Sequence, residues 1–473
     1  MTQDDLFGFT YLFGLALLAS AATVFGLAVF LKIETAMGRW VVAAMVPIMA
    51  LAIAASTLLS RRDLKYAFGN IEALALNPVP GSSALLRLIT AAIVGLSAAS
   101  VIARLYRKPA SQRLPGQLLL ASFLVFYVCN DLLNGAFGTY PAFSHNTLYV
   151  PLVFVVVYMG RNEPVGDFVR WAKIALLGLM ALSLLAAVAL PSIALEPNYK
   201  SWIPGLKVRL WGVGSNANSI GPLALLLILL ELLCPCATRT RRLLSFGLAL
   251  AVLLLAQSKT AILAGVLVTP IMAWYRLGRH PAGGVRIGFV LSLLLLLVAT
   301  TLVLMLGNFD NMWTRLAAGQ VGTDIRSLSG RVQIWNAAIN AWQDNPFFGY
   351  GPEAWGPLHR ATIGMPFAFS AHNQFLQSLS VAGSLGVLTF VLFLGSLGVS
   401  AWRASGITRG VSLTLFAMVF MRCLTETPFS TGTLFNGDTV TLLVLFRLSL
   451  MRPGHTLFTK GRVNGNTFCA VTA

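Results

Sequence analysis

The chain has 473 residues, of which 57% are hydrophobic and only 11% are charged. A soluble protein of this size has about a quarter of its residues charged, so the composition excludes an ordinary water-soluble globular protein. The net charge of +18 does not indicate a nucleic-acid-binding protein, because the Lys and Arg residues are clustered in short loops between apolar segments and form no basic stripe on a polar domain.

Apolar segments that are long enough to cross a bilayer, which takes about 20 helical residues, recur along the whole chain. They predict an all-α, polytopic membrane protein with about 12–14 transmembrane helices. The segment 373–402 is long enough to hold a half-helix followed by a span. The candidate spans are 8–31, 40–59, 85–102, 116–133, 146–159, 171–194, 218–234, 243–258, 260–276, 284–307, 373–402, 411–424 and 437–451.

Loop charges predict how these spans are oriented. Basic residues fill alternate loops, and the loops near 134–145 and 425–435 contain no Lys or Arg. The positive-inside rule therefore places the basic loops in the cytoplasm and the loops at 195–217 and 308–371 outside it. Arg61, Arg62 and Lys65 disagree with the rule, because they fall on the outer side. Either a span near the N-terminus is misplaced, or these residues bind something.

The chain is predicted to have four parts: transmembrane helices over 1–307, a periplasmic catalytic loop over 308–372, transmembrane helices over 373–451, and a basic cytoplasmic tail over 452–473. No internal repeat is visible, which disfavours a secondary transporter built from related halves.

The long outer loop holds an amphipathic segment that begins at Arg331. Val332, Trp335, Ile339 and Trp342 recur at helical spacing and predict one apolar face, which suits a helix at the membrane interface. The helix should end at Asp344-Asn345-Pro346, because proline cannot continue it. A cation in the first helical turn is disfavoured by the helix dipole, so Arg331 indicates a functional partner.

Two further features of this loop suit anion and proton chemistry. Gly349 and Gly351 allow a tight turn whose N–H groups can receive an anion. His372 lies at the start of the next apolar helix and can accept a proton near neutral pH. A structural capping role is the plainer interpretation of each feature taken alone. Together with Arg331, they favour a functional site.

More polar residues approach the outer side from other segments. Lys207 and Arg209 precede Asn216 and Asn218, which open an apolar helix whose N-terminus attracts anions. Lys259 separates two apolar segments, where it can either snorkel to the interface or pair with an anion.

This collection of cations and one histidine predicts a site for a negatively charged leaving group. The outer carboxylates form no DxD motif, no clustered pair and no metal-ligand spacing, and there is no Walker loop. We therefore expect no metal site, no two-carboxylate glycosidase mechanism and no ATP hydrolysis.

Four segments, in order, resemble the O-antigen ligase and polymerase superfamily, which includes exopolysaccharide polymerases: RLWGVGSNANSIG, AQSKTAILA, SGRVQIWNAAINAWQDNPFFGYG and HNQFLQSLSVAGSLG. The resemblance covers residues 207–386. It implies a glycosyltransferase of the bacterial inner membrane that works at the periplasmic face. It also implies a polyprenyl-diphosphate-linked glycan donor, with no cofactor, nucleotide sugar or metal.

The resemblance also implies roles for individual residues. Arg209 and Arg331 would bind the diphosphate, and His372 would act in catalysis. Lys259 stands where many relatives have arginine, so it keeps the charge but lacks the fork that binds phosphate bidentately.

The acceptor would be a glycan on a second lipid-linked repeat, which makes a polymerase, or lipid A-core or a protein hydroxyl, which makes a ligase. The SGR-x-x-x-W and S-K-T segments favour a polymerase. A chain-length regulator or a flippase is an expected protein partner. From another class, a flippase or transporter for the lipid-linked glycan remains an alternative, and it would need polar residues at mid-span.

Overall fold

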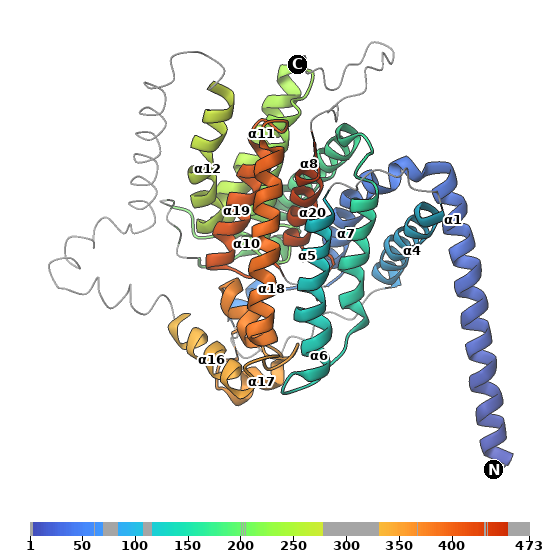
Figure 1. Cartoon of the computed structure of the whole chain (residues 1–473). Helices are drawn as coiled ribbons and strands as arrows, with labels where there is room; N and C mark the ends of the chain where they lie inside the picture. Colours follow the sequence, from blue (N-terminus) through green and yellow to red (C-terminus); the bar gives the residue numbers. More distant parts are fainter. Residues whose placement is uncertain are drawn as a thin grey trace.

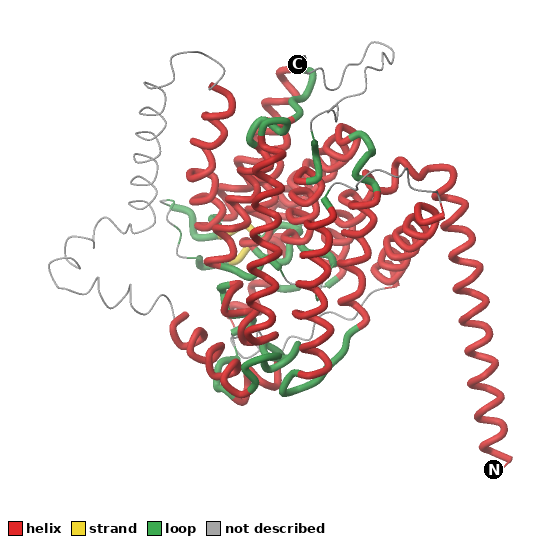
Figure 2. The backbone as a smooth tube through the Cα atoms, viewed as in Figure 1, coloured by secondary structure: helices red, strands yellow, loops and turns green. Residues whose placement is uncertain are grey.

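The structure, a computed structural model, describes residues 3–60, 62–69, 84–106, 116–199, 201, 203, 205–277, 331–366, 368–429, 432 and 434–452. Within these residues it is almost entirely helical, which confirms the all-α prediction (Figures 1 and 2). The elements before the long outer loop are α1 (Gln3–Leu59), α2 (Leu64–Gly69), α4 (Ala84–Tyr106), α5 (Gln117–Tyr127), η1 (Val128–Leu133), α6 (Asn134–Phe137), η2 (His145–Leu148), α7 (Tyr149–Met159), α8 (Val165–Ala189), α9 (Pro191–Ala194), β1 (Leu195–Glu196), β2 (Arg209–Leu210), α10 (Ala217–Leu233), α11 (Arg239–Ala256) and α12 (Lys259–Leu277).

The remaining described elements are the outer helices α16 (Arg331–Asp344) and α17 (Pro357–Thr362) and the bundle helices α18 (Gln374–Ser405), α19 (Val411–Thr425) and α20 (Gly437–Ser449). Figure 1 shows α16 and α17 together at the bottom of the bundle, away from the C-terminal end of α20. The predicted span 284–307 and the boundary between 307 and 308 lie outside the described residues, as does the tail from 453.

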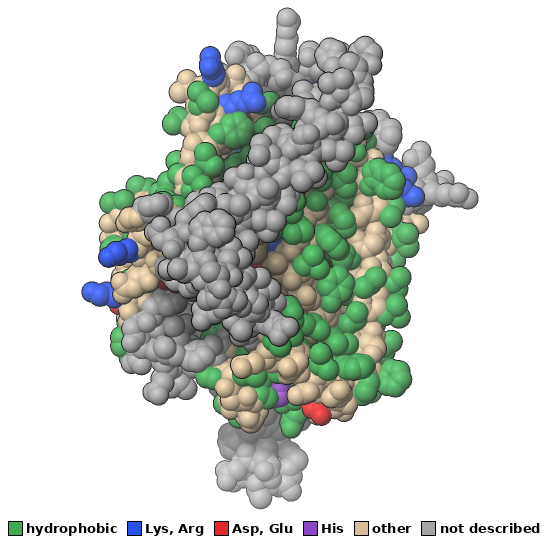
Figure 3. Space-filling model, turned by 90° about the vertical axis from the view of Figure 1, so that its left-hand side faces the viewer, with side chains coloured by type: hydrophobic (Ala, Val, Ile, Leu, Met, Phe, Trp, Pro, Cys, Tyr) green, Lys and Arg blue, Asp and Glu red, His purple; other side chains and the backbone are tan. Residues whose placement is uncertain are grey.

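Helices long and apolar enough to cross a membrane confirm the polytopic prediction. Five such segments occur among the described residues: Trp40–Leu59, Ala84–Tyr106, Gln117–Phe137, Val165–Ala189 and Gln374–Ser405. Four shorter apolar helices accompany them: His145–Met159, Ala217–Leu233, Lys259–Tyr275 and Val411–Thr425. Exposed apolar side chains such as Val188 and Trp402 face outward from the bundle, and hydrophobic side chains cover much of the described surface in Figure 3.

The predicted spans 8–31 and 40–59 follow one another without a loop between them. The segments 8–31 and 40–59 belong to the single helix α1, because the residues between them include no proline and only one glycine to interrupt it. Figure 1 shows the first half of α1 standing apart from the bundle. The buried apolar residues of its second half, from Val41 to Ala54, pack into the core.

The predicted half-helix is confirmed in α18. Its helical path is interrupted at Gly383, which has a φ of 66°. Main-chain carbonyls near this kink accept hydrogen bonds from the outer loop: Ser380 O from Tyr350 N at 2.8 Å, and Val381 O from Gly351 N at 3.0 Å. The first half of α18 is therefore held to the outer helices and the second half to the bundle.

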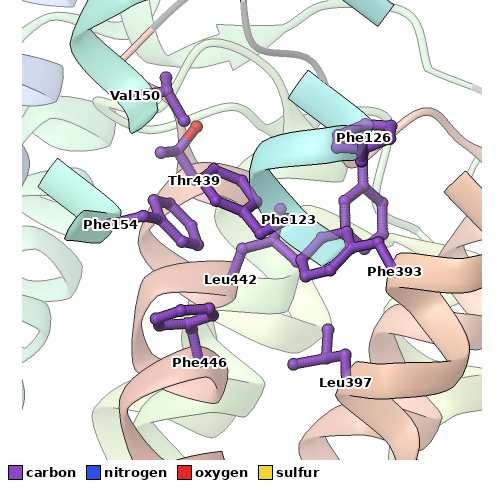
Figure 4. Close-up of a pocket in the computed structure, with 10 residues that line it drawn as sticks. Phe123, Phe126, Val150, Phe154, Phe393, Leu397, Thr439, Leu442 and Phe446 are labelled. Carbon is purple, nitrogen blue, oxygen red and sulfur yellow. The ribbon is translucent and has the colours of Figure 1, made fainter. Parts of the chain in front are cut away.

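The core beneath the outer helices is aromatic. Phe123, Phe126 and Phe393 stack with neighbouring rings, and these residues surround a small cavity between α5, α7, α18 and α20 (Figure 4). The cavity holds only about 20 Å³, which is close to one water molecule. It is too small for a lipid chain, so this region is packed core.

The bundle has two polar ends. We call the end with Arg62, Arg209 and Glu426 the site end, and the end with Arg104, Glu163 and Arg447 the opposite end. The bundle helices connect one end to the other in alternation.

Candidate functional site

The Glu426 carboxylate is the centre of the polar network at the site end. It follows α19 and meets side chains from three other segments. Its Oε2 lies 3.1 Å from Nδ1 of His372, and its Oε1 accepts a hydrogen bond from Asn218 Nδ2 at 3.0 Å. The Arg331 guanidinium lies 4.0 Å from the same Oε1. Residues from α10, α16 and the start of α18 therefore converge on one acid.

Arg209 joins this network through Asn218. It lies on β2, directly opposite Glu196 on β1, and its Nη1 is 3.9 Å from the Glu196 carboxylate. Its Nη2 donates to Asn218 Oδ1 at 2.7 Å, and its Nε donates to Ala256 O at 2.9 Å. The guanidinium is thus fixed from several sides before any ligand binds.

The main chain holds His372 in an uncommon conformation. Its φ is 47°, in the left-handed region that non-glycine residues enter at a cost of about 1–2 kcal/mol. The preceding residue, Ala371, is held from both sides. Its carbonyl accepts from Trp335 Nε1 at 3.0 Å, and its N–H donates to Gln377 Oε1 at 2.9 Å. Asn373 then caps α18 by accepting from Phe375 N and Leu376 N.

Helix α16 carries Arg331 and ends at Asp344, as the sequence predicts. The predicted apolar face is only partly correct. Ile334, Ala338 and Ala341 pack against the protein, whereas Val332 is exposed. Trp335 takes part in the site instead, because its indole N–H supports the residue before His372. The two tryptophans that suggested a membrane-facing stripe both donate hydrogen bonds within the protein.

Lys207, Lys259 and Asn216 lie at the edge of this network and are exposed. Lys259 is the first residue of α12, three positions after the Ala256 carbonyl that accepts from Arg209. Asn216 is the N-cap residue of α10, but its side chain makes no capping hydrogen bond.

The expected anion-receiving turn at Gly349 and Gly351 is not what the structure contains. The Gly349 N–H donates to Asn345 O, and the Gly351 N–H donates to Val381 O. Both residues have positive φ, and a Cβ at Gly349 would come within 2.6 Å of the Gly383 main chain. These glycines are needed for close packing of the loop against the kink of α18 and offer no free N–H groups to an anion.

Sequence reasoning missed Glu426 as the centre of the site and left Arg62 unexplained. Arg62 does lie at the site end, on the side that the span count predicts. Its guanidinium donates to the carbonyls of Ile193, Gly212, Gly214 and Ser215. It therefore binds the loop that carries Arg209, and burial lowers the pKa of Arg62 to about 10.

Charge and burial act in opposite directions on the pKa values of Glu426 and Glu196. Burial would raise the pKa of Glu426, but the hydrogen bond to His372 and the charges of His372, Arg422 and Arg331 outweigh it and lower the pKa. At Glu196 burial dominates and raises the pKa, against the Trp211 hydrogen bond and the Arg209 charge. Glu426 is therefore the acid that stays ionised most firmly.

Residues 244–391 match the family described as O-antigen ligase. This segment belongs to the O-antigen ligase family. The match confirms the resemblance seen in the sequence and covers Lys259, Arg331 and His372. Arg209, Asn218 and Glu426 lie outside the O-antigen ligase segment, so the network joins matched and unmatched parts of the chain. No curated protein matches the chain.

Proposed function

We propose that this protein is a glycosyltransferase that transfers a glycan from a polyprenyl-diphosphate-linked donor to a hydroxyl acceptor. The observation that carries the proposal is the convergence of Arg209, Arg331 and His372 around Asn218 and Glu426. The O-antigen ligase segment supports a ligase-type or polymerase-type membrane enzyme. The family resemblance implies the bacterial inner membrane, and the loop charges favour a site that faces the periplasm.

In the proposed reaction the acceptor hydroxyl oxygen attacks the anomeric carbon of the donor glycan. The bond from that carbon to the diphosphate oxygen breaks, and its electron pair leaves with the diphosphate. Arg209 and Arg331 stabilise the charge that develops on the leaving group, because preorganised cations act strongest where charge forms in the transition state. The hydroxyl proton passes to Nε2 of His372.

Lys259, Lys207 and Asn216 are proposed to help hold the diphosphate from the edge of the site. Their exposure suits a weaker contact with a large anionic lipid than that of the part-buried Arg209. Gly349 and Gly351 are not included, because their N–H groups are already bonded within the protein.

We propose a polymerase, with a second lipid-linked glycan as acceptor, and a ligase that transfers to lipid A-core as the alternative. The segments around Arg331 and Lys259, which resemble exopolysaccharide polymerases, support the first. For a flippase, the nearest support is the Arg422–Asp438 pair at 2.7 Å. That pair lies close to Asn218 at the site end, where it supports the network (Arg422 Nη1 to Asn218 O, 2.7 Å).

Purified protein in liposomes tests the function. The vesicles receive a lipid-linked glycan donor together with either a second lipid-linked repeat or lipid A-core, without metal or nucleotide. Elongated lipid-linked product supports the polymerase, and glycan on lipid A-core supports the ligase. Movement of the donor between leaflets with no new glycosidic bond would overturn the proposal in favour of a flippase.

A further inference from the structure

The role of Glu426 goes beyond balancing charge. Its carboxylate touches the proposed proton acceptor directly, through the 3.1 Å contact from Oε2 to His372 Nδ1. Its other oxygen accepts from Asn218, which in turn accepts from Arg209 at 2.7 Å. One carboxylate thus joins the histidine to the arginine proposed to hold the leaving group.

The ionisation of Glu426 determines which nitrogen of His372 carries a proton. An ionised carboxylate can only accept hydrogen bonds, so a neutral His372 must donate from Nδ1. Nε2 then has its lone pair free, which is the form that a general base requires. A carboxylate that orients a histidine in this way also stabilises the imidazolium that forms when the proton arrives.

The backbone restricts the same imidazole from the other side. His372 has a φ of 47°, and the main chain of Ala371 is fixed by Trp335 and Gln377. Strained residues persist where the surrounding contacts over-determine them, and they cluster at functional sites. The His372 side chain is 32% exposed while Glu426 is 12% exposed, so the free edge of the ring can reach a substrate and the carboxylate lies behind it.

We infer that Glu426 is the positioning residue of the transfer reaction, holding His372 with Nε2 toward the acceptor hydroxyl. This inference rests on the proposed function. Other groups near the pair are Arg331 on α16, Arg422 on α19 and Asn218 on α10. Arg331 and Arg422 are cations that favour the ionised form of Glu426, and so they maintain the same orientation of the ring.

A plain counter-ion would behave differently from a positioning residue. If Glu426 only neutralised nearby arginines, its removal would change donor binding and leave the chemical step intact. If it acts through His372, its removal lowers kcat. In an enzyme that already lacks the His372 side chain, removal of Glu426 lowers kcat little further, because the effects of residues that act as a unit are not additive.

The test measures kcat and the donor KM for the wild type, Glu426→Gln, Glu426→Asp, His372→Ala and the double variant Glu426→Gln/His372→Ala, all in liposomes. We expect Glu426→Gln to lower kcat about 10²–10³-fold with donor KM within about threefold. The fall in kcat should stay below the roughly 10⁴-fold fall that follows replacement of Asp by Asn in a Ser-His-Asp triad. Both changes replace a carboxylate by an amide of the same shape, but this site is partly open to solvent. Glu426→Asp should retain more activity than Glu426→Gln, because it keeps the negative charge.

The matched control is Glu353→Gln, an exposed acid in the same outer loop, which should leave kcat and KM unchanged. A Glu426→Gln enzyme with wild-type kcat, a loss that appears only in KM, or fully additive losses in the double variant would each overturn the inference. If Glu426→Gln fails to accumulate, Glu426→Asp in the wild-type and His372→Ala backgrounds gives the same additivity test. A wild type that makes no glycosidic bond rejects the proposed function itself, which is a separate outcome.

Discussion

The two ends of the bundle use charged residues in different ways. At the opposite end several buried or half-buried charged residues have partners at short range. Arg104 contacts Glu163 at 2.6 Å, and Arg447 donates to Glu163 O at 2.6 Å. Lys173 and Glu231 form a buried pair at 2.6 Å between α8 and α10. These contacts join elements that are distant in the sequence.

At the site end Arg422 pairs with Asp438 at 2.7 Å, but the cations proposed to act on the donor are less completely neutralised. Arg209 and Arg331 approach carboxylates only to 3.9 and 4.0 Å, and His372 shares Glu426 with Arg331. The side chains of Arg331 and His372 are 27% and 32% exposed, and Lys207 and Lys259 are exposed as well. The comparison indicates that the opposite end holds the fold together, while the site end retains positive charge for an anion that arrives from outside.

The largest effect should fall on stability at the opposite end. Lys173→Met removes one partner of the buried pair and leaves the Glu231 carboxylate, which is fully buried, without its cation. Breaking a buried ion pair in this way costs about 3–5 kcal/mol. We expect a clear fall in the thermal unfolding temperature in detergent, with the remaining folded enzyme active.

The control for that change is Arg239→Ala, an exposed residue at the start of α11, which should alter the unfolding temperature very little. The comparison would fail if Lys173→Met left stability intact, or if the folded variant lost its catalytic rate.

The next largest effect should come from replacing the two residues proposed to act on substrate. Arg331→Ala and His372→Ala should each reduce glycan transfer by about 10²–10³-fold, as expected for the loss of one preorganised group in a transition state. Both variants should insert into the membrane and unfold near the wild-type temperature, because each side chain is partly exposed. Polymer yield from a lipid-linked donor measures the effect. A normal yield from either variant would remove that residue from the mechanism.

Local patterns in the sequence predicted much of this architecture. Apolar runs located the bundle helices, and helical spacing followed by Asn345-Pro346 located the end of α16. The length of the 373–402 segment predicted a half-helix, and Gly383 provides the interruption. These features depend on residues close together in the chain, which is why spacing could reveal them.

The convergence of the site was harder to predict. Glu426 belongs to no acidic motif or pair in the sequence, because its partners come from α10, α16 and the start of α18. In the sequence, Gly349 and Gly351 resemble an anion-binding turn. Their N–H groups are instead used within the protein, and the Gly351 N–H donates to a carbonyl beside the kink of α18, which the sequence does not show. From the sequence, Arg62 was a charge on the outer side that indicated either a misplaced span or a binding role. Its partners are main-chain carbonyls more than a hundred residues away. Every residue has such a carbonyl, so the sequence does not show which of them accept a hydrogen bond.

Replacement of Arg62 should have an intermediate effect. It tests the comparison between the two ends of the bundle, because Arg62 is a cation with a structural role at the site end. Arg62→Ala removes the donor shared by the carbonyls of Ile193, Gly212, Gly214 and Ser215 and should loosen the loop that carries Arg209. Small misplacements of a binding group reduce catalysis, so we expect kcat/KM to fall about tenfold. Lys65→Ala, at an exposed position of α2, is the matched control. An Arg62→Ala enzyme with unchanged kinetics would show that the loop is held by other contacts.

The smallest effect should come from Lys259, which tests how far the positive charge of the site end extends. Its ammonium is exposed at the start of α12, so solvent and salt screen its attraction for a diphosphate. Lys259→Ala should raise the donor KM by only about two- to fivefold at low ionic strength, and the difference should shrink toward none in high salt. Lys259→Arg should match or exceed the wild type, because a guanidinium can bind phosphate bidentately. A loss as large as that of Arg331→Ala, unaffected by salt, would mean that Lys259 closes over the donor and belongs to the inner part of the site.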